Sequence, residues 1–243
     1  MLKLRNLAAP VAAMAALLAT GCDGWATDPS RPASSAEFPE PYRPKAAKIS
    51  TSFTDEEARD ERGEADKVME FADIREGMTV ADIGAGEGYY TVRLGERVGE
   101  AGRVLAQDIN RKALDRLGAR VEREGLQNIS IKLGETDDPQ LPVDSFDRIF
   151  LVHVYYEIGE PYPFLWRMWP SLTEGGQVIV VEANRPLTEN GIPPELLFCE
   201  FQTVGFKLVE FAKMPEIKGY FARFERAQAR NNPSEIEACK IGI

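Results

Sequence analysis

A glycine-rich turn stands where the first buried strand of the predicted domain ends. Within Val80–Tyr89, the glycines Gly84, Gly86 and Gly88 alternate with other residues. Glycines let a backbone approach a ligand closely, and the helix expected to follow has free N–H groups at its start. Asp82, near the end of the strand, is an acceptor for a ligand ammonium or a backbone amide. The pattern therefore predicts a ligand site outside the carboxyl ends of the strands.

A carboxylate stands at the same place in the next predicted strand. Asp108 ends the run that begins at Arg103. Because a carboxylate has only acceptor lone pairs, it can accept both hydroxyls of a sugar diol. The alternative interpretation is that Asp108 caps the helix expected from Arg111 onward.

The spacing Asp-x-Gly-x-Gly-x-Gly resembles the first motif of class I S-adenosylmethionine-dependent methyltransferases. A dinucleotide site is the competing interpretation, but the third glycine of its Gly-x-Gly-x-x-Gly fingerprint would fall where Tyr89 stands. The resemblance implies S-adenosylmethionine as the cofactor, with its methionine part against the glycine loop. The implied loop residues are Asp82, Gly84, Ala85, Gly86 and Gly88.

The same resemblance implies contacts to the adenosine part of the cofactor. It places Asp108 at the ribose and Ile109 against the adenine. In similar proteins, an acid after the third strand accepts the adenine amino group; Asp137 is the first candidate here and Asp138 the second. A solvated turn is the alternative interpretation, because Asp-Pro favours turns. With the segments before the fourth and fifth strands, the resemblance covers about residues 60–225.

Residues that could act on a methyl acceptor follow the fourth predicted strand, where the resemblance places acceptor contacts. His153, the only histidine, can serve as a general base because an imidazole titrates near pH ~6.5. A hydrogen-bonded structural histidine is the alternative. Tyr156 can line a pocket or pack, and Glu157 can act as a base or cap a helix. The candidate catalytic residues are therefore His153, Tyr156 and Glu157, and no metal site is predicted.

Hydrophobic periodicity predicts the elements that position these residues. Helices are expected at 55–74, 87–98, 111–124, 163–171 and 195–204, and strands at 79–83, 103–108, 129–133, 146–152, 177–182, 206–211 and 218–225. The early alternation of strand and helix indicates a parallel sheet with helices on both faces. The last two strands are too close for a crossover helix and should pair antiparallel. The expected fold is α/β: a doubly wound, mostly parallel seven-stranded sheet with a C-terminal antiparallel hairpin.

Residues 1–22 have the pattern of a bacterial export signal. Lys3 and Arg5 precede the apolar run Leu7–Ala19, which is too short to span a bilayer as a helix. The small residues before Cys22 resemble the lipobox of bacterial lipoproteins, in which the cysteine is acylated. An ordinary secretory signal is the alternative.

The remainder of the chain divides by composition. Residues 23–50, rich in proline, serine and alanine, are expected to form an extended tether. The predicted methyltransferase domain covers residues 51–230, followed by a tail at residues 231–243. Cys199 and Cys239 could pair in an oxidising compartment or remain free thiols.

The net charge and the export signal together limit the classes of function that the sequence favours. The net charge of −10 argues against broad nucleic-acid binding. The sequence favours an exported, lipid-anchored methyltransferase at the periplasmic face of a bacterial membrane, acting on a small molecule or an envelope component. The alternative is a non-catalytic ligand-binding protein with the same fold, because S-adenosylmethionine is made and used inside the cell.

Replacing Cys22 by serine tests the lipid anchor, because serine lacks the thiol that acylation requires. We expect wild-type protein in the membrane fraction and the Cys22→Ser protein outside it, as measured by fractionation and immunoblotting. Cys199→Ser is the matched control and should stay with the membranes. Unchanged membrane association of the Cys22→Ser protein would exclude acylation at this cysteine.

Overall fold

The computed structural model describes residues 31–44 and 56–240. The export signal and Cys22 lie outside the described residues. The strands are β1 (Thr79–Ile83), β2 (Arg103–Asp108), β3 (Ile129–Leu133), β4 (Phe146–Val152), β5 (Leu172–Ala183), β6 (Phe206–Met214) and β7 (Gly219–Arg226). The α-helices are α1 (Glu56–Glu61), α2 (Glu64–Phe71), α3 (Tyr89–Val98), α4 (Arg111–Glu124), α5 (Pro161–Met168) and α6 (Pro194–Val204). Within the described ranges, no helix combines the length and apolar character needed to cross a bilayer.

The strands form one sheet in the order β3-β2-β1-β4-β5-β7-β6. Strands β1 to β5 pair in parallel, whereas β7 is antiparallel to both β5 and β6. The predicted doubly wound sheet with a C-terminal antiparallel hairpin is confirmed. The fifth strand begins earlier than predicted, because Leu172 pairs with Phe146 beyond a register shift in which β5 carries the extra residues.

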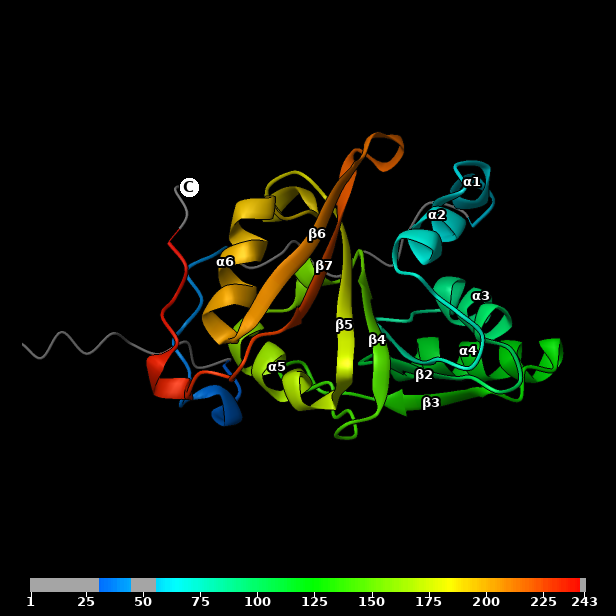
Figure 1. Ribbon diagram of the computed structural model, residues 1–243, viewed down its shortest axis with the longest axis horizontal. Helices are drawn as coiled ribbons and strands as arrows, with labels where there is room; N and C mark the ends of the chain where they lie inside the picture. The colour runs from blue at the N-terminus through cyan, green and yellow to red at the C-terminus, as the bar shows by residue number, and fades with distance from the viewer. Residues whose placement is uncertain (1–30, 45–55, 241–243) are drawn as a thin grey trace, which may run out of the picture. The chain divides into compact units, whose positions relative to one another are not determined.

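The central strands are buried on both faces, which explains their continuous apolar runs. In β5, Val178 and Val180 belong to the cluster that contains α5 and α6. Ile179 and Val181 belong to the cluster that contains α2 and α3. Figure 1 shows the two sides: α5 and α6 lie on one side of the sheet, and α3 and α4 lie on the other.

The first predicted helix, expected at residues 55–74, is divided in two. Gly63 has a φ of 62° and precedes α2, so the chain turns sharply between α1 and α2. A left-handed backbone is accessible to glycine at little steric cost. The turn places Glu64 at the start of α2 and directs it toward the end of β4, where it meets His153.

Part of the predicted tether packs on the domain. We call residues 32–44 the arm. Phe38 in the arm is buried and makes an edge-to-face contact with Trp166, the ring centroids being 5.7 Å apart. The hydroxyls of Ser34 and Ser35 donate to Asp137 Oδ2 at 2.6 and 2.7 Å. An extended tether is therefore wrong for these residues, because a few buried contacts outweigh a composition rich in proline and serine.

The predicted C-terminal tail also packs on the domain. Cys239 forms a disulfide with Cys199 of α6, and its backbone N–H donates to the hydroxyl of Tyr162 at 2.7 Å. Ile236 is buried in the cluster formed with α5 and α6. Of the two possibilities for the cysteines, the structure shows the paired one.

Removing the disulfide should destabilise the domain, because a cross-link limits the conformational freedom of the unfolded chain. Cys199 and Cys239 are separated by 40 residues, a loop for which chain entropy predicts about 3–4 kcal/mol. We expect Cys199→Ser/Cys239→Ser to lower the free energy of unfolding in urea by about this amount. A reducing agent should lower the stability of the wild type but leave the double variant unchanged. Equal stability of oxidised wild type and double variant would contradict a stabilising role.

Candidate cofactor and acceptor site

The site lies where the strand order reverses. β1 pairs with β2 on one side and with β4 on the other, and successive crossovers leave this point on opposite faces of the sheet. Ligands of doubly wound sheets bind in the crevice outside the carboxyl ends of the strands at this point. The loops after β1, β2 and β4 hold most of the residues predicted from the sequence.

The three glycines of the loop after β1 have separate roles. All three have positive φ angles, 70° at Gly84, 56° at Gly86 and 91° at Gly88. A Cβ at Gly84 would lie 2.4 Å from Val154 Cγ2, and one at Gly88 would lie 2.3 Å from Leu117 Cδ1. A Cβ at Gly86 would meet nothing within 4 Å. Packing therefore requires glycine at the first and third positions, whereas the second faces open space that a ligand can enter.

The loop is fastened to β2. The N–H groups of Gly84 and Ala85 both donate to the carbonyl of Gln107, at 2.8 and 3.0 Å. Gly86 N–H donates to Asp108 Oδ2 at 2.8 Å. The carboxylate of Asp108 therefore points at the glycine loop, as the predicted cofactor site requires.

Asp108 retains capacity for a ligand. Its Oδ1 accepts the N–H of Asn110 at 2.7 Å, so each oxygen has one backbone donor. A carboxylate offers about four lone-pair sites, which leaves two for the hydroxyls of a ribose. The cap of α4 is Asn110, whose side chain accepts the N–H groups of Lys112 and Ala113, so the alternative role of Asp108 as a helix cap does not hold. Ile109, next to it, is 43% exposed and offers an apolar surface for a nucleobase.

Asp82 lies beneath the glycine loop and is 4% exposed. Its Oδ2 accepts the hydroxyl of Thr91 in α3 at 2.5 Å. Burial raises the pKa of Asp82 to about 6, and the negative charge of Asp108 adds to the rise. A positively charged ligand group arriving at this edge would hold Asp82 in its ionised form.

The structure changes the choice between Asp137 and Asp138. Asp137 is buried, and its Oδ2 accepts hydrogen bonds from Ser34, Ser35 and Arg167. Despite burial, these donors lower the pKa of Asp137. Its carboxylate holds the arm to α5, so our preference for Asp137 as the adenine acceptor is corrected. Asp138 is partly exposed, and its Oδ1 accepts the N–H of Gln140; it is the remaining candidate.

His153 begins the turn after β4, with a φ of 55°. Its backbone N–H donates to the carbonyl of Val181, and its Nε2 lies 3.4 Å from Glu64 Oε1. Glu64 is 1% exposed and also accepts from Arg59 at 2.6 and 3.1 Å. Although burial opposes it, hydrogen bonds from His153 and Arg59 lower the pKa of Glu64 to about 2. An ionised carboxylate thus orients the imidazole, an arrangement suited to a general base.

Tyr156 and Glu157 form a pair in the same turn. The hydroxyl of Tyr156 donates to Glu157 Oε1 at 2.8 Å. Burial raises the pKa of Glu157, and the negative charge of Asp108 adds to the rise. Burial and the hydrogen bond to Glu157 also raise the pKa of Tyr156, so its hydroxyl stays protonated. The turn therefore offers a hydrogen-bonded pair, and its carboxylate is near enough to Asp108 at the cofactor edge for the two charges to interact.

Two buried glutamates near the candidate site, Glu182 and Glu64, are not among the residues predicted from the sequence. Glu182 at the end of β5 is fully buried, and its Oε1 accepts the N–H groups of Tyr155 and Tyr156 at 2.7 and 3.4 Å. Burial raises its pKa to about 8. Its place at the end of an apolar run is the signal that identified Asp108, and it could have identified Glu182 too. Nothing in the sequence around Glu64 predicts its contact with His153.

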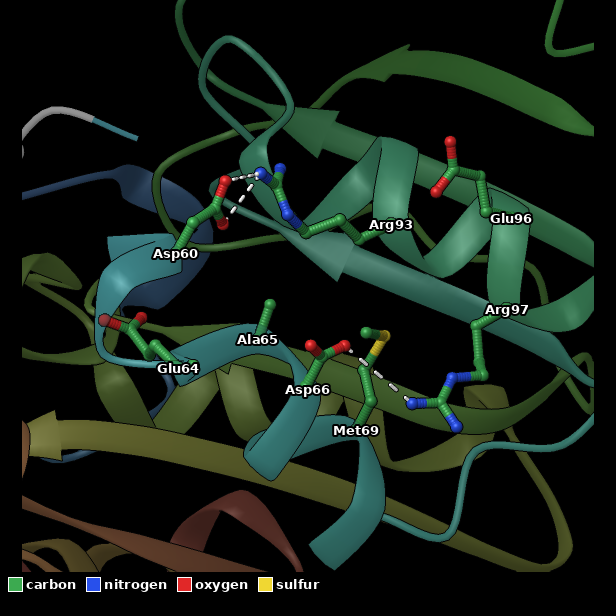
Figure 2. A pocket seen from close by; sticks show the side chains of 9 residues that line it. Asp60, Glu64, Ala65, Asp66, Met69, Arg93, Glu96 and Arg97 are labelled. Atoms are coloured by element: carbon green, nitrogen blue, oxygen red, sulfur yellow. Dashed lines mark hydrogen bonds and ion pairs between the residues drawn. The ribbon is translucent and has the colours of Figure 1, made fainter. Parts of the chain in front are cut away.

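A pocket of about 580 Å³ lies beside the predicted site, between the α1–α2 turn and α3. Figure 2 shows its charged lining, in which Arg93 pairs with Asp60 and Arg97 with Asp66. None of the residues predicted to bind the cofactor lines this pocket. It meets the candidate site only through Glu64. Within the described ranges, no group of three or more histidine, cysteine or acidic side chains is arranged to hold a metal ion.

Comparison with known families identifies the domain. Residues 74–221 match the family described as a methyltransferase domain. The chain belongs to the methyltransferase-domain family. S-adenosylmethionine is accordingly the cofactor, and the open space at Gly86 together with the remaining lone pairs of Asp108 fits its adenosyl group.

Similar proteins support this family and its fold. The ubiquinone/menaquinone biosynthesis C-methyltransferase of Escherichia fergusonii is 31% identical over 123 residues, covering 48% of this chain and 47% of that protein. The match therefore spans about half the length of this relative. The structure of an S-adenosylmethionine-dependent methyltransferase from Aquifex aeolicus covers 71% of this chain and 98% of its own, with 22% identity and a TM-score of 0.64. The [4+2]-cyclase SpnF covers 80% and 90%, with 14% identity and a TM-score of 0.60.

Replacing Gly86 by alanine should weaken cofactor binding, because the methyl group would enter the space left for the ligand. We expect at least a tenfold rise in the Kd for S-adenosylhomocysteine, measured by calorimetry. The left-handed backbone should cost about 1–2 kcal/mol of stability. Gly125→Ala is the matched control, because Gly125 also has a positive φ and open space but ends α4 away from the loop. Equal effects of the two variants on the Kd would contradict the site.

Proposed function

We propose that this protein is an S-adenosylmethionine-dependent methyltransferase, exported and lipid-anchored, that acts on a small molecule or an envelope component. The observation that supports it most is the meeting of two chain segments at one edge. Asp108 accepts the N–H of Gly86, and the space in front of Gly86 is open. Together with membership in the methyltransferase-domain family, this arrangement favours a nucleoside cofactor at the carboxyl ends of β1 and β2.

The protein has to hold the cofactor and present an acceptor to it. S-adenosylmethionine supplies a methyl group already activated by a positively charged sulfur. Asp108 would accept the ribose hydroxyls, and the loop from Gly84 to Gly88 would lie against the methionine part. Asp82 would compensate positive charge beneath the loop. The chain then needs only to align the acceptor, exclude water and accept a proton.

His153 is the group that we assign to the proton. Glu64 holds the imidazole from Nε2, and its ionised carboxylate would stabilise the imidazolium that forms when His153 takes a proton. Tyr156 remains protonated and is held by Glu157, so it is suited to donate a hydrogen bond to an acceptor oxygen. The pair would orient the acceptor while His153 removes its proton.

The acceptor class is narrowed by the named relative. That protein is a C-methyltransferase of ubiquinone and menaquinone biosynthesis. Methyl transfer to carbon releases a proton from the acceptor, and a site with a histidine oriented by a carboxylate is suited to accept one. We therefore include a ring-unmethylated naphthoquinol with a short isoprenoid chain as the first probe acceptor.

Two observations support export. The sequence before Cys22 resembles a lipobox, and the described part of the chain contains a disulfide between Cys199 and Cys239. Disulfides persist in oxidising compartments and are rare in the cytosol. Export requires that S-adenosylmethionine reach the domain from its site of synthesis inside the cell.

The competing function is binding of this compound without methyl transfer, because the fold is also that of a [4+2]-cyclase.

Calorimetry on the mature protein separates these functions. We expect S-adenosylmethionine and S-adenosylhomocysteine to bind, and methyl transfer from a radiolabelled donor to occur with the probe quinol or with a lipid extract of the envelope. Failure of a folded sample to bind either compound would remove the methyltransferase assignment. Binding without transfer to either acceptor would favour the non-catalytic function.

Substitutions at the dyad test the proton transfer. We expect His153→Ala to lower turnover by about 100-fold or more while the Kd for S-adenosylhomocysteine changes less than threefold. Glu64→Gln should lower turnover in the same direction, because the neutral amide stabilises an imidazolium less. Glu70→Gln, an exposed change on the same helix, is the matched control. If His153→Ala changes turnover and affinity together, or neither, the base assignment is wrong.

A further inference from the structure

The arm reaches the turn that bears the candidate acceptor residues. Arg43 Nη1 lies 3.1 Å from Glu200 Oε2 in α6, and Arg43 Nη2 donates to the carbonyl of Ile158. Glu200 Oε2 also accepts the hydroxyl of Tyr155 at 2.9 Å. The guanidinium carbon of Arg43 lies 5.5 Å from the centre of the Tyr155 ring. Arg43 thus contacts the last carbonyl of the turn directly and its first tyrosine through Glu200.

The turn is also held by Glu182 of β5. The backbone N–H groups of Tyr155 and Tyr156 donate to Glu182 Oε1. The N–H of Glu157 donates to the carbonyl of Val154, and that of Ile158 to the carbonyl of Tyr155. The amides of residues 155–158 are therefore all bonded. The turn is fixed between β5, through Glu182, and α6 with the arm, through Glu200 and Arg43.

The contact with Arg43 is a buried one. The side chain of Arg43 is 3% exposed and that of Glu200 is 1% exposed. A buried carboxylate without a counter-charge is costly, and removing one partner of such a pair is strongly destabilising. Burial raises the pKa of Glu200, while the charge of Arg43 and the hydroxyl of Tyr155 oppose the rise. Without Arg43, Glu200 would either take up a proton or turn toward water, and in the second case Tyr155 would lose its acceptor.

The turn also contacts the cofactor loop. Val154 stands where any Cβ at Gly84 would lie, and Tyr156 and Glu157 follow it two and three residues later. A displacement of Tyr155 or Ile158 would therefore change where the Tyr156–Glu157 pair lies relative to the cofactor edge. The arm, which precedes α1 in the sequence, therefore makes contacts that bear on where this pair lies.

We propose that Arg43 is a positioning residue: the arm sets the place of the Tyr156–Glu157 pair through the Arg43–Glu200–Tyr155 contacts and the carbonyl of Ile158. The functional meaning of this position rests on the proposed methyltransferase function. The mechanical coupling between the arm and the turn is independent of that function, because it is defined by contacts within this chain alone.

Hydrogen exchange measured by mass spectrometry reads this coupling without an acceptor. In the mature Arg43→Met protein, we expect the amides of residues 155–158 to exchange at least tenfold faster than in the wild type. Peptides from β1 and α3 should exchange within twofold of the wild-type rate. Ser34→Ala is the matched control, because it removes an arm contact to Asp137 that does not involve the turn. It should leave exchange at residues 155–158 within twofold of wild type.

Conservative and compensating variants separate positioning from general stability. Arg43→Lys keeps the charge and should restore at least half of the lost protection. Arg43→Met/Glu200→Gln removes both charges, so the domain should stay folded even if Arg43→Met alone does not; the turn should still exchange faster than in wild type. Wild-type exchange at residues 155–158 in Arg43→Met or in the double variant would overturn the proposal. Equally raised exchange throughout the domain in the double variant would overturn it too.

A further measurement distinguishes this proposal from the proposed function. We expect Arg43→Met/Glu200→Gln to bind S-adenosylhomocysteine with a Kd within threefold of wild type but to methylate the probe quinol at least tenfold more slowly. If neither the wild type nor the double variant binds S-adenosylhomocysteine, the proposed methyltransferase function is wrong. The hydrogen-exchange result still tests whether the arm and the turn are coupled. If the cofactor binds normally and turnover is unchanged despite faster exchange, the turn moves without consequence and the positioning role is wrong.

Discussion

The hydrogen bond from Gly86 N–H to Asp108 is the contact on which the candidate site depends. It joins the loop after β1 to the end of β2, two segments that parallel pairing brings to one edge. The bond orients the carboxylate toward the space in front of Gly86 while leaving lone pairs for a ligand. Tight packing at Gly84 and Gly88 keeps the loop in the conformation that makes this bond. The site is therefore prepared by the backbone before any cofactor contact is made.

Three buried glutamates surround the turn after β4, and their partners decide their charge. Glu64 meets Arg59 and His153, and its pKa falls to about 2 in spite of burial. Burial raises the pKa of Glu182 to about 8, the negative charge of Glu157 adds to the rise, and the hydrogen bonds that Glu182 accepts from backbone N–H groups oppose it. Burial also raises the pKa of Glu200, because the charge of Arg43 and the hydroxyl of Tyr155 offset only part of its desolvation. Glutamate thus serves in two forms: Glu64 is an anion beside His153, and Glu182 is a largely neutral acceptor for the amides of the turn.

The fold alone does not fix the reaction, since a [4+2]-cyclase of similar structure covers most of this chain. The residues that we assign to the acceptor side lie in the turn after β4. One short segment carries a histidine oriented by Glu64 and a protonated tyrosine that is hydrogen-bonded to a half-buried carboxylate. The packed arm and the disulfide-linked tail enclose the same half of the domain, around α5 and α6. Segments outside the predicted domain thereby take part in its core.

The sequence by itself determined the order of elements, the parallel sheet with its terminal hairpin, and the placement of Gly84 to Gly88 and Asp108 at one edge. These follow from local patterns: apolar runs fix buried strands, and glycine spacing fixes the loop. Only the tertiary structure decided that Asp137 holds the arm, that Glu64 orients His153, that Cys199 pairs with Cys239, and that Arg43 reaches Tyr155 through Glu200. Each of these contacts joins residues from separate elements. Their distance and burial arise from packing, which no local spacing encodes.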